Sequence, residues 1–361
     1  MIRWFLLYLL VFCGALGLSA VLCAAARALG RRWGLMDQPA GRKAHERPIA
    51  LTGGWAIYAT FVILVAGGAM LSGPLAASLP PFFEPLRRYL LNIAEIHGKL
   101  LAVLGGTTLM FVTGVVDDLR PLSPRVKLTC QILATLPLLA VGIAIHGFLP
   151  APLGWLLTAL WVVGLTNSFN LLDNMDGLSA SVALVICLVL ALAALQGGQF
   201  WIPALFLCLA GTLGGYLCYN FHPATLFMGD AGSLTIGYLM AVFSIQITYY
   251  VPSEPTSLPV FMPLAIMGVP LFDTLSVMVI RWRAGRPLML GDRNHFSHRL
   301  LALGLSVRQT ALTIALLTGA CGLLALPLRS LHLAAALIHM LGLALLFSVV
   351  IMLEMAGRIR K

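Results

Sequence analysis

The chain has 361 residues, of which 60% are hydrophobic and only 10% are charged. Because a soluble domain carries about a quarter charged residues, this composition excludes an ordinary water-soluble protein and makes lipid the solvent for much of the chain. The basic residues behind the formal charge of +10 lie at the ends of apolar runs, which favours anionic lipid headgroups and anionic substrates as partners and argues against nucleic acid.

A spanning helix needs about 20 mostly apolar residues, and windows of that size predict about eleven transmembrane helices. Their ranges lie near 3–26, 51–72, 98–117, 127–147, 151–170, 177–197, 199–219, 231–250, 259–281, 309–328 and 331–355. The seven cysteines fall inside apolar runs and form no Cys-x-x-Cys pair, so they are interpreted as small buried hydrophobes. The sequence therefore predicts an all-α, polytopic membrane helix bundle that forms a single domain over residues 1–361.

An odd number of spans places the two termini on opposite sides of the membrane. Most of the 23 lysines and arginines fall in the connections on one side, together with the C-terminal residues. Positively charged connections face the cytosol, so we expect the C-terminus to be cytosolic and the N-terminus to lie outside.

The first predicted cytosolic connection carries Lys43 and His45 shortly before a helix entrance with the sequence Thr52-Gly53-Gly54. Glycines at such an entrance let backbone amides approach a phosphate. Taken alone, however, the segment is explained better as a basic loop that sets the topology and contains a glycine turn.

Two adjacent carboxylates, Asp117 and Asp118, end the predicted helix 98–117. The helix dipole disfavours negative charge at that end, so the pair indicates a bound cation or a role in proton transfer. The alternative is a solvated helix end whose aspartates pair with Arg120 or Lys127.

Four polar residues at spacings of three cross the end of the predicted helix 151–170, namely Asn167, Asn170, Asp173 and Asp176. On a helical segment such residues share one face. Helix capping would explain the two aspartates but not two asparagines inside apolar sequence, so the pattern favours a binding function.

Two further cytosolic segments carry chemistry. Asp230 follows Gly229 at a helix entrance, where a carboxylate-held metal and backbone amides can meet one phosphate. The last loop supplies His295, His298 and Arg299, which suit a diphosphate better than zinc. Asp273, inside the predicted helix 259–281, is interpreted as the partner of an arginine such as Arg281 and is left out of the site.

Together these segments indicate phosphoryl chemistry with a divalent metal at the cytosolic interface, between a soluble anion and a lipid anion. Their order along the chain resembles the polyprenyl-phosphate N-acetylhexosamine-1-phosphate transferases of glycosyltransferase family 4. The resemblance rests on Asp117-Asp118, the Asn-x-x-Asn-x-x-Asp-x-x-Asp-Gly run from Asn167, the segment from Phe227 to Ser233, and the final histidine-containing loop.

The last loop and the predicted eleven spans are similar to the undecaprenyl-phosphate N-acetylglucosaminyl-1-phosphate transferase branch. That branch often has a histidine where this chain has Ser297. The phospho-N-acetylmuramoyl-pentapeptide transferase branch typically has ten spans and three consecutive histidines, and the sequence predicts neither feature.

The resemblance implies a role for each matching residue. It implies that Asp230 and Asp117 bind Mg²⁺, or Mn²⁺ in its place, that Asp117 acts on the lipid phosphate as a base, and that Asp118 supports the metal or the base. The residues implied to bind the nucleotide diphosphate and uridine are Asn167, Asn170, Asp173, Asp176 and Asn220. Those implied to contact the diphosphate, the sugar or other phosphates are Lys43, His45, Lys127, His295, His298 and Arg299.

The implied reaction transfers N-acetylhexosamine 1-phosphate, with N-acetylglucosamine as the expected sugar, from a UDP-sugar to undecaprenyl or another polyprenyl phosphate. UMP is released, and the product starts a cell-envelope glycan such as lipopolysaccharide or teichoic acid. The resemblance further implies a multi-pass protein of the bacterial inner membrane and leaves a homodimer open. The alternatives are the pentapeptide transferase of peptidoglycan synthesis and a membrane transporter, which would spread ionisable residues across the membrane depth.

Overall fold

The computed structural model describes residues 2–38, 47–80, 84, 87, 90, 91, 93–146, 149–287 and 294–359. Its helices and strands in chain order are α1 (Ile2–Trp33), β1 (Met36–Asp37), β2 (Ile49–Ala50), α2 (Gly53–Ser78), η2 (Ile93–Ile96), α4 (His97–Leu119), α5 (Pro124–Ala140), α6 (Ala151–Leu172), α7 (Leu178–Gln196), α8 (Trp201–Asn220), α9 (Gly229–Ile245), η3 (Leu258–Phe261), α10 (Met262–Ile266), α11 (Gly268–Arg283), α12 (Phe296–Ala302), α13 (Val307–Ala325), η4 (Leu326–Arg329) and α14 (Leu333–Ile359).

The predicted all-α membrane bundle is confirmed. Within the described residues, eight helices are long and apolar enough to cross a membrane, or nine if the bent pair formed by 258–266 and α11 counts as one span. A helical bundle is expected here because lipid offers no partner for backbone N–H and C=O groups, which an α-helix satisfies internally.

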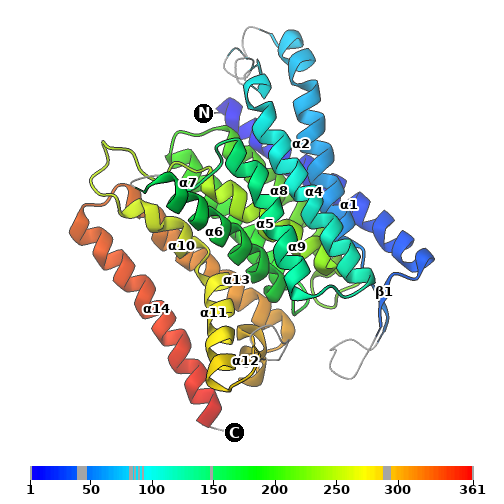
Figure 1. The fold of residues 1–361 in the computed structure, drawn as a ribbon, viewed down its shortest axis with the longest axis vertical. Coiled ribbons are helices and arrows are strands. Elements are labelled where there is room, and N and C mark those ends of the chain that lie inside the picture. Colours follow the sequence, from blue (N-terminus) through cyan, green and yellow to red (C-terminus); the bar gives the residue numbers. More distant parts are fainter. Residues whose placement is uncertain are drawn as a thin grey trace.

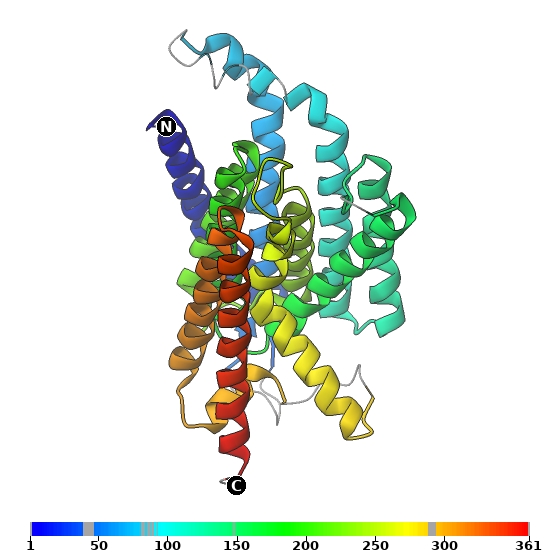
Figure 2. The ribbon, with the colours of Figure 1, turned by 90° about the vertical axis from the view of Figure 1, so that its left-hand side faces the viewer.

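The predicted number of eleven spans is not confirmed, although every predicted range overlaps helical structure. Helices α5 and α9 have only 17 residues each, which is shorter than the roughly 20 residues that a bilayer requires. The predicted range 259–281 contains a bend of 69° between α10 and α11. The two termini do lie at opposite ends of the bundle (Figures 1 and 2), and their orientation relative to the cytosol stays a prediction.

Helix α9 forms the centre of the bundle and packs against α4, α6 and α2 (Figure 1). Every residue of α9 from Ala231 to Ser244 is buried, so protein rather than lipid surrounds this helix. Glycines permit the close approach, because a Cβ atom on Gly237 would lie 2.7 Å from the Cα atom of Thr166 in α6. Small residues are the usual means by which membrane helices pack closely.

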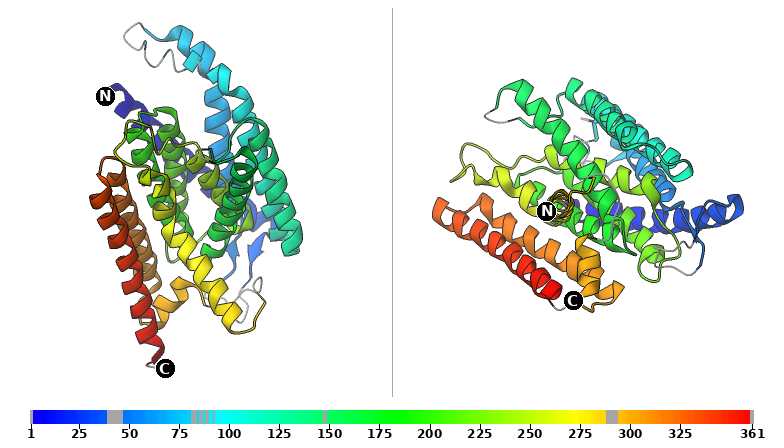
Figure 3. Two further views of the ribbon diagram at one scale, coloured as in Figure 1. Left: turned by 60° about the vertical axis from the view of Figure 1, so that its left-hand side comes forward. Right: turned by 60° about the horizontal axis from the view of Figure 1, so that its bottom comes forward.

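The strands lie at the same end of the bundle as α12 and the C-terminus (Figures 1 and 2). β1 and β2 pair antiparallel, and Ala50 accepts a hydrogen bond from the backbone of Phe227 at 2.8 Å. Helices α13 and α14 run side by side along one edge, while α11 diverges from them toward its C-terminal end (Figures 2 and 3).

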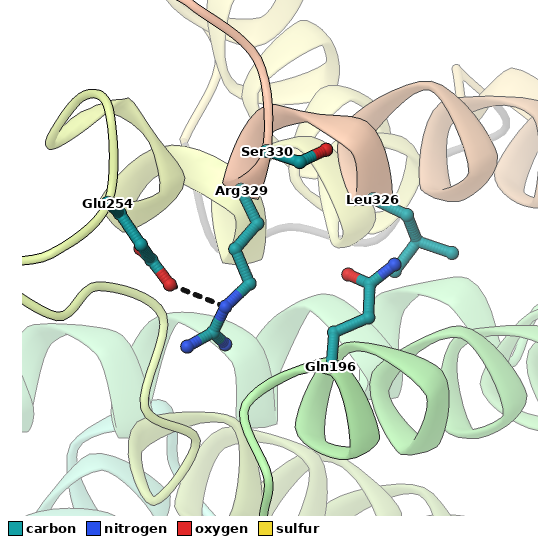
Figure 4. A pocket seen from close by; sticks show the side chains of 5 residues that line it. All are labelled: Gln196, Glu254, Leu326, Arg329 and Ser330. Atoms are coloured by element: carbon teal, nitrogen blue, oxygen red, sulfur yellow. Dashed lines mark ion pairs between the residues drawn. The ribbon is translucent and has the colours of Figure 1, made fainter.

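A cavity of about 350 Å³ lies at the opposite end of the bundle, between the end of α7 and η4. Figure 4 shows Arg329 pointing toward Glu254 across this hollow, with Gln196 on its α7 side, and the two charged side chains form an ion pair. Arg329 also donates to the carbonyl of Thr248 at 2.9 Å. The ion pair lies at this cavity, which is far along the helices from the aspartate-rich segments.

Candidate active site

The last turn of α4 and the first turn of α9 bring three carboxylates together. Asp117 and Asp118 lie in that last turn of α4, and Asp230 is the second residue of α9. The approach depends on glycine, because a Cβ atom on Gly114 would lie 2.3 Å from the backbone oxygen of Asp230. Gly229 has φ +64° and faces the Asp118 carboxylate, a backbone conformation that favours glycine.

Asp118 stabilises the start of α9. Its Oδ1 accepts the backbone N–H of Asp230 at 2.8 Å, and its Oδ2 accepts that of Ala231 at 3.1 Å. These are N–H groups of the first turn, which have no partner inside the helix, and the positive end of the helix dipole adds to the attraction. Asp118 therefore positions Asp230 relative to α4.

Lys127, near the start of α5, connects the other two carboxylates. Its Nζ lies 2.6 Å from Oδ2 of Asp117 and 2.6 Å from Oδ2 of Asp230. The Oδ1 atom of Asp117 accepts the backbone N–H of Leu122 at 2.6 Å, which fixes the carboxylate that faces the lysine. The predicted alternative pairing of an aspartate with Lys127 is thus confirmed for Asp117, but Asp230 shares the same ammonium.

Two of the four polar residues predicted to share one face at the end of α6 form hydrogen bonds with neighbouring helices. The amide of Asn167 exchanges hydrogen bonds with the amide of the buried Gln131 in α5, at 2.8 and 3.2 Å. Asn170 donates to the Ser233 hydroxyl of α9 at 2.9 Å. Both asparagines therefore fasten α6 to its neighbours, a function that residue spacing could not reveal.

Asp173 follows α6 and accepts no hydrogen bond from the described residues. Burial, together with the nearby negative charges of Asp230, Asp118 and Asp176, raises the pKa of Asp173 to about 8. A partly buried carboxylate beside three others is unfavourable without a cation, so this cluster indicates that positive charge belongs in the site.

Asp176 and Asn220 shape the segment that leads into α9. Oδ2 of Asp176 accepts the backbone N–H of Ala224 at 3.0 Å and lies 2.8 Å from Nδ1 of His222. Asn220 accepts the N–H of Gly177 at 3.0 Å and donates to the carbonyl of Leu226 at 3.0 Å. Asn220 is 3% exposed, so its contacts position the backbone of the site.

The last loop reaches the same end of the bundle through buried polar contacts. Asp273 of α11, which is 1% exposed, lies 2.9 Å from Nδ1 of His295 and accepts the backbone N–H of Phe296 at 2.6 Å. The Ser297 hydroxyl donates to Oδ1 of Asn174, which joins α12 to the segment beside Asp173. Arg299 donates to the Ser276 hydroxyl at 2.8 Å.

These contacts correct the interpretation of Asp273. Its partner in the structure is His295, a predicted site residue, so Asp273 belongs with the site. Sequence contained a signal, because an ionisable residue inside an apolar helix is by default a functional candidate. The contact with Asp273 at Nδ1 also orients the buried ring of His295.

Comparison with known proteins identifies the family. Residues 100–248 match the family model described as glycosyl transferase family 4. The probable undecaprenyl-phosphate N-acetylglucosaminyl 1-phosphate transferase of Bacillus subtilis is 33% identical over 307 residues, which cover 82% of this chain and 78% of that protein. The chain belongs to glycosyl transferase family 4. It is therefore a transferase that is built as a membrane helix bundle.

Two other family members show which of the two branches considered above matches more of this chain. The decaprenyl-phosphate N-acetylglucosaminephosphotransferase of Mycolicibacterium smegmatis is 32% identical over 321 residues, which cover 81% of this chain and 75% of that protein. A phospho-N-acetylmuramoyl-pentapeptide-transferase of Desulforudis audaxviator is 37% identical, but over only 142 residues, 38% of this chain and 40% of that protein. Likeness over most of the chain therefore lies with the N-acetylglucosaminyl branch.

In this family member, two carboxylates share one place for a cation. No group of three or more histidine, cysteine or acidic side chains within the described residues is arranged to hold a metal ion. Asp117 and Asp230 instead converge on one cation, the Lys127 ammonium. Mg²⁺ in phosphate-handling enzymes is usually held by one or two carboxylates plus substrate phosphates. Asp117 and Asp230 therefore fit the role of protein ligands for Mg²⁺.

The remaining predicted site residues stay predictions. Lys43 and His45 lie outside the described residues. His298 is partly buried on α12 beside the positioned His295. The glycines of the first loop have a structural partner, because Gly53 and Gly54 donate to the carbonyls of Phe227 and Met228 at 2.8 and 3.0 Å. Their amides hold α2 against the start of α9 rather than facing a phosphate.

Proposed function

We propose that this chain transfers N-acetylglucosamine 1-phosphate from UDP-N-acetylglucosamine to a polyprenyl phosphate and releases UMP. The observation that carries the proposal is the convergence of Asp117 and Asp230 on Lys127, each at 2.6 Å, where α4, α5 and α9 meet at one end of a membrane bundle. The names of the relatives from Bacillus subtilis and Mycolicibacterium smegmatis support the acceptor and the sugar.

The reaction brings two anions together, so its main requirement is positive charge at the site. An oxygen of the polyprenyl phosphate attacks the sugar-bearing phosphorus, the bond to UMP breaks, and UMP leaves with the electron pair. Mg²⁺ held by Asp117 and Asp230 would neutralise charge on the diphosphate. Lys127 and Arg299 supply positive charge from the chain itself, and His295 is a hydrogen-bond partner for the diphosphate or the sugar.

Direct attack suffices because the acceptor phosphate is already a charged nucleophile. The adjacent Lys127 ammonium keeps Asp117 ionised, which is the form of the carboxylate that can accept a remaining proton from that phosphate. Holding both substrates in line contributes much of the remaining rate enhancement. The lipid acceptor places the reaction at the face of a bilayer, which we propose is the cytosolic face of a bacterial plasma membrane, as the first step of a cell-envelope glycan.

The test measures UMP release by the purified, detergent-solubilised chain with polyprenyl phosphate. The donors are UDP-N-acetylglucosamine, UDP-N-acetylgalactosamine and UDP-N-acetylmuramoyl-pentapeptide, each with Mg²⁺ and with a chelator. We expect Mg²⁺-dependent UMP release with UDP-N-acetylglucosamine. Release with the pentapeptide donor alone would replace the proposed branch, and no release with any donor would refute the transfer reaction.

A further inference from the structure

The ammonium of Lys127 occupies the place where the two converging carboxylates need a cation. It lies 2.6 Å from an oxygen of Asp117 and 2.6 Å from an oxygen of Asp230. The Asp117 carboxylate accepts the N–H of Leu122, and the backbone of Asp230 is positioned by its own N–H, which donates to Asp118. These two contacts bring the carboxylates toward each other independently of the lysine side chain.

Two carboxylates fixed this close repel each other unless a cation lies between them. A lysine ammonium is a compact charge on a flexible four-carbon side chain, and the side chain of Lys127 is 21% exposed, so it has room to leave. A divalent cation and the ammonium compete for the same oxygens, since Asp117 and Asp230 present one common place to both.

We propose that Lys127 is the resident counter-ion of the metal-free site and leaves the carboxylate pair when a divalent cation binds. This inference rests on the proposed function only in taking Asp117 and Asp230 as the metal ligands. Lys127 thereby balances the negative charge of the two carboxylates and discourages metal binding in the absence of substrate. Once displaced, its ammonium is available to substrate phosphates, which are the oxygen ligands that complete a Mg²⁺ site.

The proposal predicts the direction in which metal affinity changes when the lysine is removed. A Lys127→Met variant loses the competing charge and should bind divalent metal at least about tenfold more tightly, since a unit charge at contact distance acts strongly at a partly buried site. If Lys127 instead held the two carboxylates in place for the metal, the same variant would bind the metal more weakly.

The experiment titrates the purified protein, without nucleotide or lipid, with Mn²⁺ and follows the free-ion signal by electron paramagnetic resonance. Arg125→Met is the matched control, because it removes the same charge from an exposed residue two positions away. We expect tighter Mn²⁺ binding in Lys127→Met than in Arg125→Met, and loss of that gain in a Lys127→Met, Asp230→Asn double variant. Equal or weaker binding than in the control overturns the proposal.

A second measurement covers the case in which Lys127→Met does not fold. In the wild-type protein, labelling of Lys127 by an amine-reactive reagent is compared with that of the exposed Lys99, with Mg²⁺ and with a chelator. A released ammonium should react faster relative to Lys99 when Mg²⁺ is present, and an unchanged or lower ratio refutes the exchange. UMP release plays no part in either measurement, so failure of the proposed reaction and failure of this inference are distinguishable.

Discussion

Gly114 is the residue through which the distance between α4 and α9 can be tested. A Cβ atom there would lie 2.3 Å from the backbone nitrogen of Ala231 and 2.3 Å from the backbone oxygen of Asp230, whereas ordinary contact begins at 3.4 Å. Both neighbours are backbone atoms of α9, which cannot rotate away as a flexible side chain would. Gly114→Ala must therefore separate the two helices locally by about 1 Å, at a cost of ~1–3 kcal/mol for overpacking.

That separation acts directly on the proposed metal ligands, because Asp117 lies three residues after Gly114 and Asp230 is the residue being displaced. A misplacement of about 1 Å in a site that aligns two substrates can cost ~100-fold in rate. We expect Gly114→Ala to lower kcat for UMP release by about that factor in protein that still purifies as a folded species with a measurable Tm.

Gly105→Ala is the control, because it makes the same change on the same helix where no atom lies within 4 Å of the added methyl. It should leave kcat unchanged, and the thermal unfolding of both variants gives the stability difference. If kcat of Gly114→Ala lies within twofold of kcat of Gly105→Ala, the close contact between α4 and α9 does not set the geometry of the site.

Three further substitutions test individual contacts. Asp230→Asn should abolish UMP release while the protein inserts and purifies normally, and near-wild-type turnover would remove the assignment of Asp230 as a metal ligand. Asp273→Asn should lower kcat/KM about tenfold or more by releasing His295. The Asp273→Asn, His295→Ala double variant should lose no more kcat/KM than His295→Ala alone, whereas additive losses would show that the two residues act independently. Asn167→Ala leaves the buried amide of Gln131 without its partner, so it should lower Tm by several degrees and leave KM for the UDP-sugar unchanged; a raised KM would restore Asn167 to the substrate site.

The sequence was sufficient to select segments that the structure then brings together at the candidate site, for a physical reason. Carboxylates and amides are costly in apolar sequence, so Asp117, Asp173 and Asp230 are visible against it. The approximate helix ranges could also be predicted from the sequence, because length and composition define them. The 17-residue α9 was predicted as an ordinary span, since nothing local distinguishes a helix surrounded by protein from one that faces lipid.

The contacts between the segments could not be predicted, because they depend on how the helices pack. Lys127 reaches Asp230 across 103 residues and Asp118 caps α9 across 112 residues. The pairing of Asp273 with His295 likewise joins two elements and displaced the expected pairing with a neighbouring arginine. Sequence identified Asn167 and Asp173 as members of one strip, but packing commits the first to Gln131 and leaves the second without a described hydrogen-bond donor.

Helix polarity explains why three aspartates that lie close together in space, two at the end of α4 and one at the start of α9, make different contacts. At the C-terminal end of α4 the dipole opposes negative charge, whereas the first turn of α9 attracts it and offers unpaired N–H groups. Asp118 directs both of its oxygens at the N–H groups of that turn. Asp117 and Asp230 each direct one oxygen at the Lys127 ammonium. The proposed metal ligands therefore come from one residue of each helix, and Asp118, which joins the two helices, sets their spacing.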